Sequence, residues 1–146
     1  MELPIDHFRL LGVNPTSDLQ SLLLTLQQRI DRPPEHGLTQ DTLRAREELL
    51  RASADLLSDG SKRQAYESDL TALASSGQPV LPALDVSPGM EVAGLLLLLE
   101  AGQAQECFEL VCAALEPPQA PILGNSRAAD LTILAGLACL AAAADL

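Results

Sequence analysis

Leucine and alanine recur at helical spacing along most of the chain, and short polar turns separate these apolar stretches. From Asp18 onward the apolar residues fall on one face of a helix. They are Leu19, Leu22, Leu23, Leu26 and Ile30. A hydroxyl in the turn over 14–17 is expected to cap this helix, and Arg32 should end it, because the prolines that follow disfavour the α region.

A second long helix is expected from a cap at Thr39 to about Leu57, with leucines on one side and charged residues on the other. Because a short loop joins two helices of similar length, we expect them to pack antiparallel. Two shorter helices complete this half of the chain. One ends at Gly12, and the other runs from Ser61 to about Leu73.

The second half of the chain opens with a strongly apolar helix. Ser87 and Pro88 suit the cap and the first position of a helix that reaches Ala101. Its run of leucines over 95–99 is apolar on all sides, so we expect the protein core to bury it. The alternative is that the run stays exposed and forms a groove for a partner.

Two further helices are expected after Gly102, the first of them reaching Leu115 and forming a hairpin with its predecessor. The positions of that helix expected to point inward are Cys107, Phe108, Val111, Cys112 and Leu115. Prolines follow it, and the last helix should start after Ser126. No stop signal precedes Leu146, so we expect the natural chain to continue.

Composition supports an all-α fold. Hydrophobic residues make up 47% of the chain but aromatic residues only 2%, whereas sheets draw on aromatic and β-branched residues. The formal net charge is −11. Such acidity disfavours binding to nucleic acids or anionic membranes. The longest uncharged apolar run, 131–144, is shorter than the roughly 20 residues that cross a bilayer.

Charge and composition divide the chain into three parts. Residues 1–73 contain eight of the nine basic residues. A small, polar, proline-containing linker is expected over 74–86, and the helical hairpin region over 87–146. The sequence leaves open whether the two halves share one core. Arg44, Arg46 and Arg51 could meet an acidic peptide tail, but solvated helix charge is the favoured interpretation.

The sequence offers no catalytic, metal or cofactor site. Its three cysteines lack paired spacing and lie in apolar runs, so Cys107, Cys112 and Cys139 are expected to be reduced thiols of the core. His7 and His36 are far from them along the chain, which disfavours zinc. No phosphate-binding glycine loop or nucleophile–base pair is recognisable. We therefore expect a protein that is not an enzyme.

Two short blocks in the first half resemble the two ends of DnaJ-type J domains. The first block contributes Asp6, Phe8, Leu11 and Gly12, and the second contributes Leu57, Ser58, Asp59, Lys62, Arg63 and Tyr66. Two amphipathic helices of suitable length separate the blocks. The resemblance implies structural roles for these residues: Phe8, Leu11 and Tyr66 in the core, and Asp59 as a helix cap.

The chain departs from J domains at the loop that contacts DnaK-type chaperones. That loop carries His-Pro-Asp in active J domains, and Pro34, Glu35 and His36 stand at those places here. The preceding helix offers only Arg29, with Arg32 beyond it, where active J domains are basic. We infer that a J-like scaffold is kept and that the chaperone contact is lost.

A J-like start without His-Pro-Asp, followed by helices, is similar to the ZipN family of cyanobacterial cell-division proteins, relatives of a chloroplast-division J-like protein. The segments over 3–12, 95–102 and 127–131 carry the likeness. It implies a non-catalytic adaptor that recruits or stabilises the FtsZ ring at the cytoplasmic face of the inner membrane. The membrane span would lie further along the natural chain. The alternative is an atypical J-domain co-chaperone of a DnaK-type chaperone.

Overall fold

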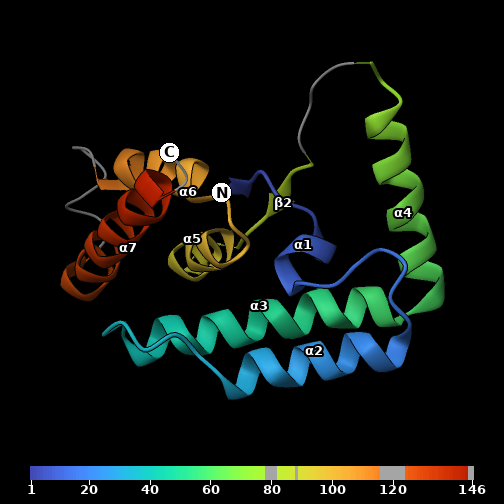
Figure 1. Cartoon of the computed structure of the whole chain (residues 1–146), viewed down its shortest axis with the longest axis horizontal. Coiled ribbons are helices and arrows are strands. Elements are labelled where there is room, and N and C mark those ends of the chain that lie inside the picture. Colours follow the sequence, from blue (N-terminus) through green and yellow to red (C-terminus); the bar gives the residue numbers. More distant parts are fainter. Residues whose placement is uncertain (78–81, 88, 116–123, 145–146) are drawn as a thin grey trace.

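The computed structural model describes residues 1–77, 82–87, 89–115 and 124–144, with only the backbone for 124–128 and 144. Over these residues the chain forms seven helices and one two-stranded sheet. Figure 1 shows the helices Leu19–Asp31 and Gln40–Ser58 side by side, with the other elements above them. The prediction of an all-α protein is confirmed.

The first three helices begin and end largely where the pattern places them. Helix α1 (His7–Leu11) ends at Gly12, which adopts φ +87°. Helix α2 (Leu19–Asp31) runs antiparallel to α3 (Gln40–Ser58), whose cap is Thr39 as predicted. The predicted hydroxyl cap of α2 is wrong. The carboxylate of Asp18 accepts the Ser21 N–H at 2.8 Å instead, because Asp is as effective a cap and directly precedes the helix.

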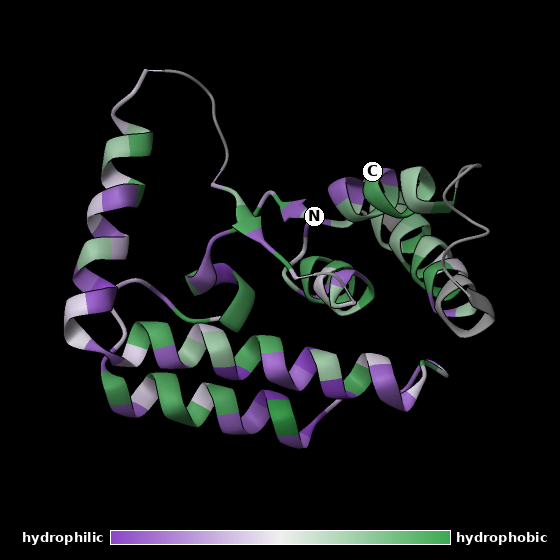
Figure 2. Ribbon diagram, turned by 180° about the vertical axis from the view of Figure 1, so that it is seen from behind, coloured by the Kyte–Doolittle hydropathy of each residue, from purple (hydrophilic) through white to green (hydrophobic). Residues whose placement is uncertain are grey.

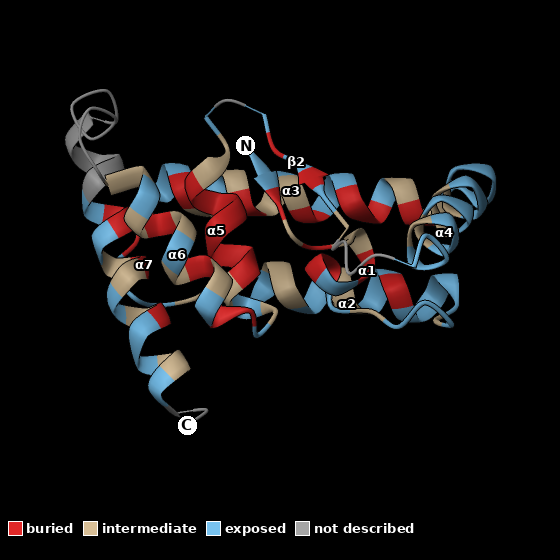
Figure 3. Cartoon of the chain, turned by 90° about the horizontal axis from the view of Figure 1, so that it is seen from above, coloured by how far each residue is buried: buried red, intermediate tan, exposed pale blue. Residues whose placement is uncertain are grey.

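Helix α4 (Gly60–Ala74) stands beside this layer rather than inside it. The carboxylate of Asp59 caps it by accepting the Lys62 N–H at 3.0 Å. None of its residues is fully buried, and Figure 3 shows it mostly in the colour of exposed residues. Its half-buried side chains, Tyr66 and Leu70, attach it to the core.

A short sheet links the two halves. Strand β1 (Glu2–Leu3) pairs antiparallel with β2 (Leu84–Asp85). The backbone N–H of Val86 donates to the carbonyl of Met1 at 2.8 Å. The end of the segment expected as a linker is therefore a strand packed against the N-terminus. Residues 78–81 of that segment lie outside the described residues.

Helix α5 (Glu91–Glu100) begins later than predicted. Its cap is Met90, which makes no side-chain hydrogen bond, and Gly89 at φ +95° sets a turn before it. A left-handed residue interrupts a right-handed helix, so the helix cannot extend back to Pro88, which itself lies outside the described residues. Leucines 95–98 are buried, so they belong to the core and not to a partner groove.

Helices α6 (Ala104–Leu115) and α7 (Gly124–Ala144) pack against each other and complete the second half. Of the inward positions predicted on α6, Cys107 and Val111 are buried and the other three are half-buried. Helix α7 starts at Gly124, three residues before the start predicted after Ser126. The segment 116–123, whose prolines were expected to end the preceding helix, lies outside the described residues.

The two halves share one hydrophobic core. Buried residues of α1, α3 and β1 join those of α5, α6 and α7 in a single cluster, which appears red at the centre of Figure 3. Gly94 marks the closest approach, since a Cβ there would lie 2.8 Å from Leu3 Cδ1 and 3.3 Å from Val86 Cγ2. Figure 2 shows the strongly apolar α5 between β2 and the helices of the second half. The division of the chain into a domain of residues 1–73 and a helical region of residues 87–146 stays a prediction.

Candidate functional site

The two blocks that resemble J domains meet where α1, α3 and α4 come together. The backbone N–H of His7 donates to the Tyr66 hydroxyl at 2.9 Å, and the Tyr66 and Phe8 ring centroids lie 6.0 Å apart. The guanidinium of Arg63 lies 5.4 Å from the centre of the Phe8 ring. It also donates to the carbonyls of Pro15 and Ser17, at 2.8 Å each. These contacts hold α4 against α1.

The remaining block residues occupy helix ends or the core. The carboxylate of Asp6 accepts the Arg9 N–H at 2.8 Å at the start of α1. Leu11 and Leu57 are 0% and 1% exposed, and the Ser58 hydroxyl donates to the carbonyl of Ala54 at 2.6 Å. Lys62 alone among the block residues on α4 points its charge to solvent without a recorded side-chain contact in the described residues.

A histidine–serine pair lies in the same region, with the histidine half-buried and the serine buried. The Nδ1 of His7 and the Oγ of Ser53 are hydrogen-bonded at 2.8 Å. Burial lowers the pKa of His7, and the nearby Asp6 carboxylate opposes that shift. Ser53 is 1% exposed, so a substrate has no path to its hydroxyl. We read the pair as a packing contact.

The loop between α2 and α3 is tied to the second half of the chain. The hydroxyls of Thr39 and Thr42 each donate to Oδ2 of Asp130 at 2.6 Å. The Thr39 N–H reaches the same carboxylate at 3.2 Å. Asp130 lies on α7 and is 1% exposed. The loop between α2 and α3 is thus anchored at its C-terminal end.

A cluster of arginines, which we call the arginine junction, joins α1, α2, α3 and α5. It comprises Arg9, Arg29, Arg46 and Glu100. Arg46 binds Glu100 through two hydrogen bonds, Nε–Oε2 at 2.8 Å and Nη2–Oε1 at 2.7 Å. The Nη2 of Arg29 lies 3.3 Å from Oε1 of Glu100. Two helices of the first half are thereby fixed to the end of α5.

The arginine junction is partly closed to solvent. The side chains of Arg46, Arg29 and Glu100 keep 3%, 18% and 24% of their surface exposed. Burial lowers the pKa of Arg29, Glu100 opposes this, and the neighbouring Arg46 adds to it. The prediction that Arg46 is a solvated charge on the helix surface is therefore wrong. Nothing in the spacing of residues around Arg46 indicates that it pairs with Glu100, which lies 54 positions away.

The other two arginines considered for an acidic tail lie on the surface of α3. Arg44 lies 3.8 Å from the Asp41 carboxylate, and Arg51 lies 3.0 Å from that of Glu47. Both pairs follow helical spacing and stand in solvent, which agrees with the interpretation as solvated helix charge.

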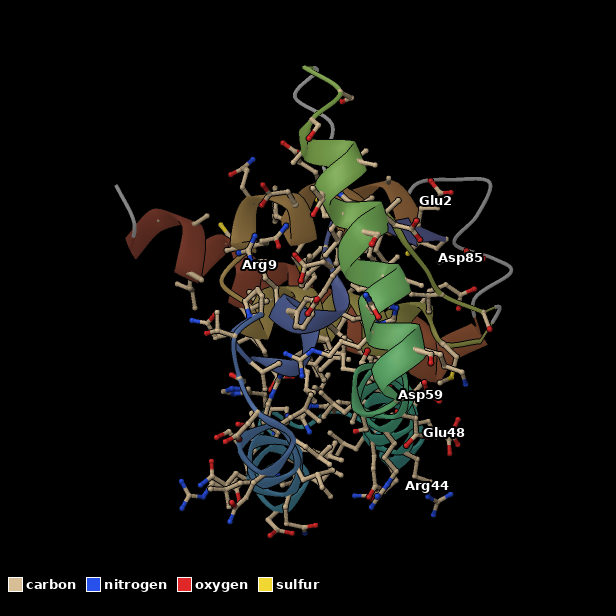
Figure 4. The ribbon with its side chains drawn as sticks, turned by 90° about the vertical axis from the view of Figure 1, so that its right-hand side faces the viewer. Glu2, Arg9, Arg44, Glu48, Asp59 and Asp85 are labelled. Atoms are coloured by element: carbon tan, nitrogen blue, oxygen red, sulfur yellow. The ribbon has the colours of Figure 1, made fainter. Side chains whose placement is uncertain are left out.

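Beside the arginine junction the surface has an open depression of about 560 Å³. Its lining is Arg9, Gly12, Val13, Arg29, Glu100 and Ala101. Arg9 is exposed, and its Nη2 donates to the carbonyl of Ala101 at 3.5 Å, which is a long hydrogen bond. Figure 4 shows Arg9 beside α1, apart from the charged residues labelled on α3.

Helix α2 leaves part of its predicted apolar face in solvent. Of the five expected residues only Leu22 is buried. Leu19 and Leu23 are 51% and 47% exposed, and neighbouring Leu24 is 59% exposed. The rest of the protein covers only one side of α2. The apolar face of the helix is therefore wider than the surface that packs against its neighbours.

The cysteines differ in exposure, which corrects the expectation of three core thiols. All three are free, and Cys139 is exposed while Cys112 is half-buried. Burial raises the pKa of the Cys107 thiol to about 12, and its Sγ donates to the carbonyl of Leu95 at 3.3 Å. Among the described residues, no group of three or more His, Cys, Asp or Glu side chains is arranged to hold a metal ion. None of the helices in the described parts is long and apolar enough to span a bilayer.

Comparisons with known proteins relate the chain to division. Residues 85–146 match a family described as plastid division regulator ARM repeat. The chain is similar to the Arabidopsis thaliana protein accumulation and replication of chloroplasts 6, chloroplastic, with 27% identity over 143 residues. The aligned residues make up 98% of this chain and 17% of that relative. The chain therefore spans about a sixth of the length of that curated relative. No solved structure matches. Both matches are to division-related proteins.

Proposed function

We propose that this chain is the non-catalytic platform of a ZipN-like division protein that recruits or stabilises the FtsZ ring. The observation that carries the proposal is the similarity to a division-related relative, which runs through both halves of the chain. The site would be the cytoplasmic face of the inner membrane, with a membrane span elsewhere in the natural chain. Residues 1–73 would supply a J-like scaffold without chaperone activity.

The contacts between the halves support an adaptor that works as one rigid unit. The arginine junction fixes α2 and α3 to α5 through Glu100. Asp130 ties the start of α3 to α7. A platform held at two places by partly buried polar contacts presents a constant surface to a partner, which lowers the entropy lost on binding.

Binding to FtsZ tests the proposal directly. Tagged protein of residues 1–146, and a longer version that reaches the membrane span, are used to capture purified FtsZ. We expect retention by at least one of them. Glu100→Arg, which disrupts the arginine junction, should weaken capture, while Glu48→Arg on the exposed side of α3 makes the same charge change and should not.

Failure of both versions to retain FtsZ would refute the proposal. Stimulation of a DnaK-type ATPase by either version would instead indicate an atypical co-chaperone. We expect a flat ATPase rate, because the loop over 32–39 lacks His-Pro-Asp and is anchored to Asp130.

A further inference from the structure

The arginine junction carries a surplus of positive charge in an acidic chain. Arg46 and Arg29 contact the single carboxylate of Glu100, and exposed Arg9 lines the depression beside them, so these four side chains carry a formal charge of +2, whereas the whole chain carries −11. An excess of buried or half-buried cations is unfavourable unless something compensates it. The contacts of the single carboxylate determine which arginine lacks compensation.

Glu100 is occupied by the two inner arginines. Arg46 takes both of its oxygens, and Arg29 shares one of them. Arg29 also donates to the carbonyl of Leu10 at the end of α1. Arg9 has only the carbonyl of Ala101, at 3.5 Å, and none of the ion pairs among the described residues includes it. The guanidinium of Arg9 is thus the exposed charge of the cluster that stands outside an ion pair.

We propose that the depression beside Arg9 binds a carboxylate of an acidic segment of a partner protein. Arg9 and the outer edge of Arg29 both line it, and a guanidinium binds a carboxylate through two parallel hydrogen bonds. Val13 and Ala101 supply apolar walls for the rest of the segment. The volume of about 560 Å³ lies within the usual range of ligand pockets.

The helix ends around the depression favour a carboxylate over a phosphate. Helices α1 and α5 both end at it, with Gly12 and Ala101 as their C-caps. A helix C-terminus carries partial negative charge, which repels a dianion more than a monoanion. Phosphate sites are typical of helix N-termini instead. The helix ends therefore oppose a phosphate dianion more than a carboxylate.

This inference rests on the proposed adaptor role, because it names the chemistry of a partner. Its test uses synthetic peptides, so its failure is distinguishable from a failure to bind FtsZ. The protein of residues 1–146 is labelled with nitrogen-15 and titrated with acetylated tetraglutamate amide. The readouts are the NMR signals of the Gly12 amide and the Arg9 Nε–H. Acetylated tetraglutamine amide and inorganic phosphate form the comparison arms.

We expect tetraglutamate to shift both signals in a saturable manner and tetraglutamine to leave them unchanged. Arg9→Gln should weaken binding at least tenfold, and Arg44→Gln, an equal charge change on the far side of α3, should stay within twofold of the native protein (Figure 4). Equal weakening by both variants would mean non-specific attraction and would overturn the proposal. Phosphate binding without peptide binding would overturn it as well, and so would shifts of equal size with tetraglutamine.

Discussion

Removing the charge of Glu100 should reveal how strongly the arginine junction holds the fold together. Glu100→Gln keeps the shape of the side chain but leaves Arg46, which is 3% exposed, without a counter-charge. Breaking a fully buried ion pair in this way costs about 3–5 kcal/mol. The Glu100 side chain is 24% exposed, so solvent screens part of the loss, and the amide oxygen keeps one acceptor. We expect a loss of about 2 kcal/mol in the free energy of unfolding.

Urea denaturation followed by far-ultraviolet circular dichroism measures this loss. The midpoint should fall while the slope against urea stays unchanged, which indicates a change in stability and not in compactness. For a chain of this size the melting temperature should drop by about 4–8 °C. Glu48→Gln is the matched control, because Glu48 is exposed on α3, and its effect should stay within about 0.5 kcal/mol.

A double substitution at the arginine junction should restore part of the free energy of unfolding. Arg46→Met combined with Glu100→Met removes both charges, and apolar replacement of a buried pair is often neutral. The double variant should therefore be more stable than Glu100→Gln alone. A Glu100→Gln variant as stable as the control would show that solvent fully compensates Arg46, and the argument for a structural junction would fail.

Three further predictions concern buried groups. Burial lowers the pKa of His7 below 6.5, so the unfolded chain binds more protons than the folded protein at acidic pH. The free energy of unfolding should therefore fall as the pH drops from about 7 to about 5. His7→Gln should flatten this pH dependence, and His36→Gln should leave it unchanged. With a pKa raised to about 12, Cys107 should resist iodoacetamide at pH 8 in the native state while exposed Cys139 reacts, as mass spectrometry would report. Gly94→Ala should destabilise the protein by about 1 kcal/mol in urea denaturation, because overpacking against fully buried side chains outweighs the gain in helix propensity; a more stable variant would contradict the close approach.

Local signals in the sequence accounted for most of the helices. Gly12, Thr39 and Asp59 act at the helix ends where their residue types placed them. The errors arose where two local signals competed. Asp18 capped α2 in place of a nearby hydroxyl, and the left-handed turn at Gly89 overrode the proline signal for the start of α5.

The contacts between the halves could not be predicted from local patterns. The partners of Glu100 and Asp130 lie 54 and about 90 positions away, and neither residue differs in type or spacing from an ordinary surface acid. Exposed leucines on α2 were missed for a related reason. Helical periodicity identifies an apolar face, but only the arrangement of neighbouring helices decides how much of it is covered.

The contacts of the basic residues leave the first half with little free positive charge for an acidic surface such as the chaperone surface considered for a J domain. The sequence already offered few of them on α2, and the structure turns Arg29 inward, toward Glu100 and the end of α1. Arg63 is likewise engaged, by carbonyls of the turn before α2 and by Glu67. Electrostatic attraction between proteins needs exposed charge of opposite sign. Arg9 is exposed, belongs to none of the ion pairs among the described residues and lies beside the depression at the junction, so we expect an acidic partner to be drawn to the junction between the halves and not to the face of α2.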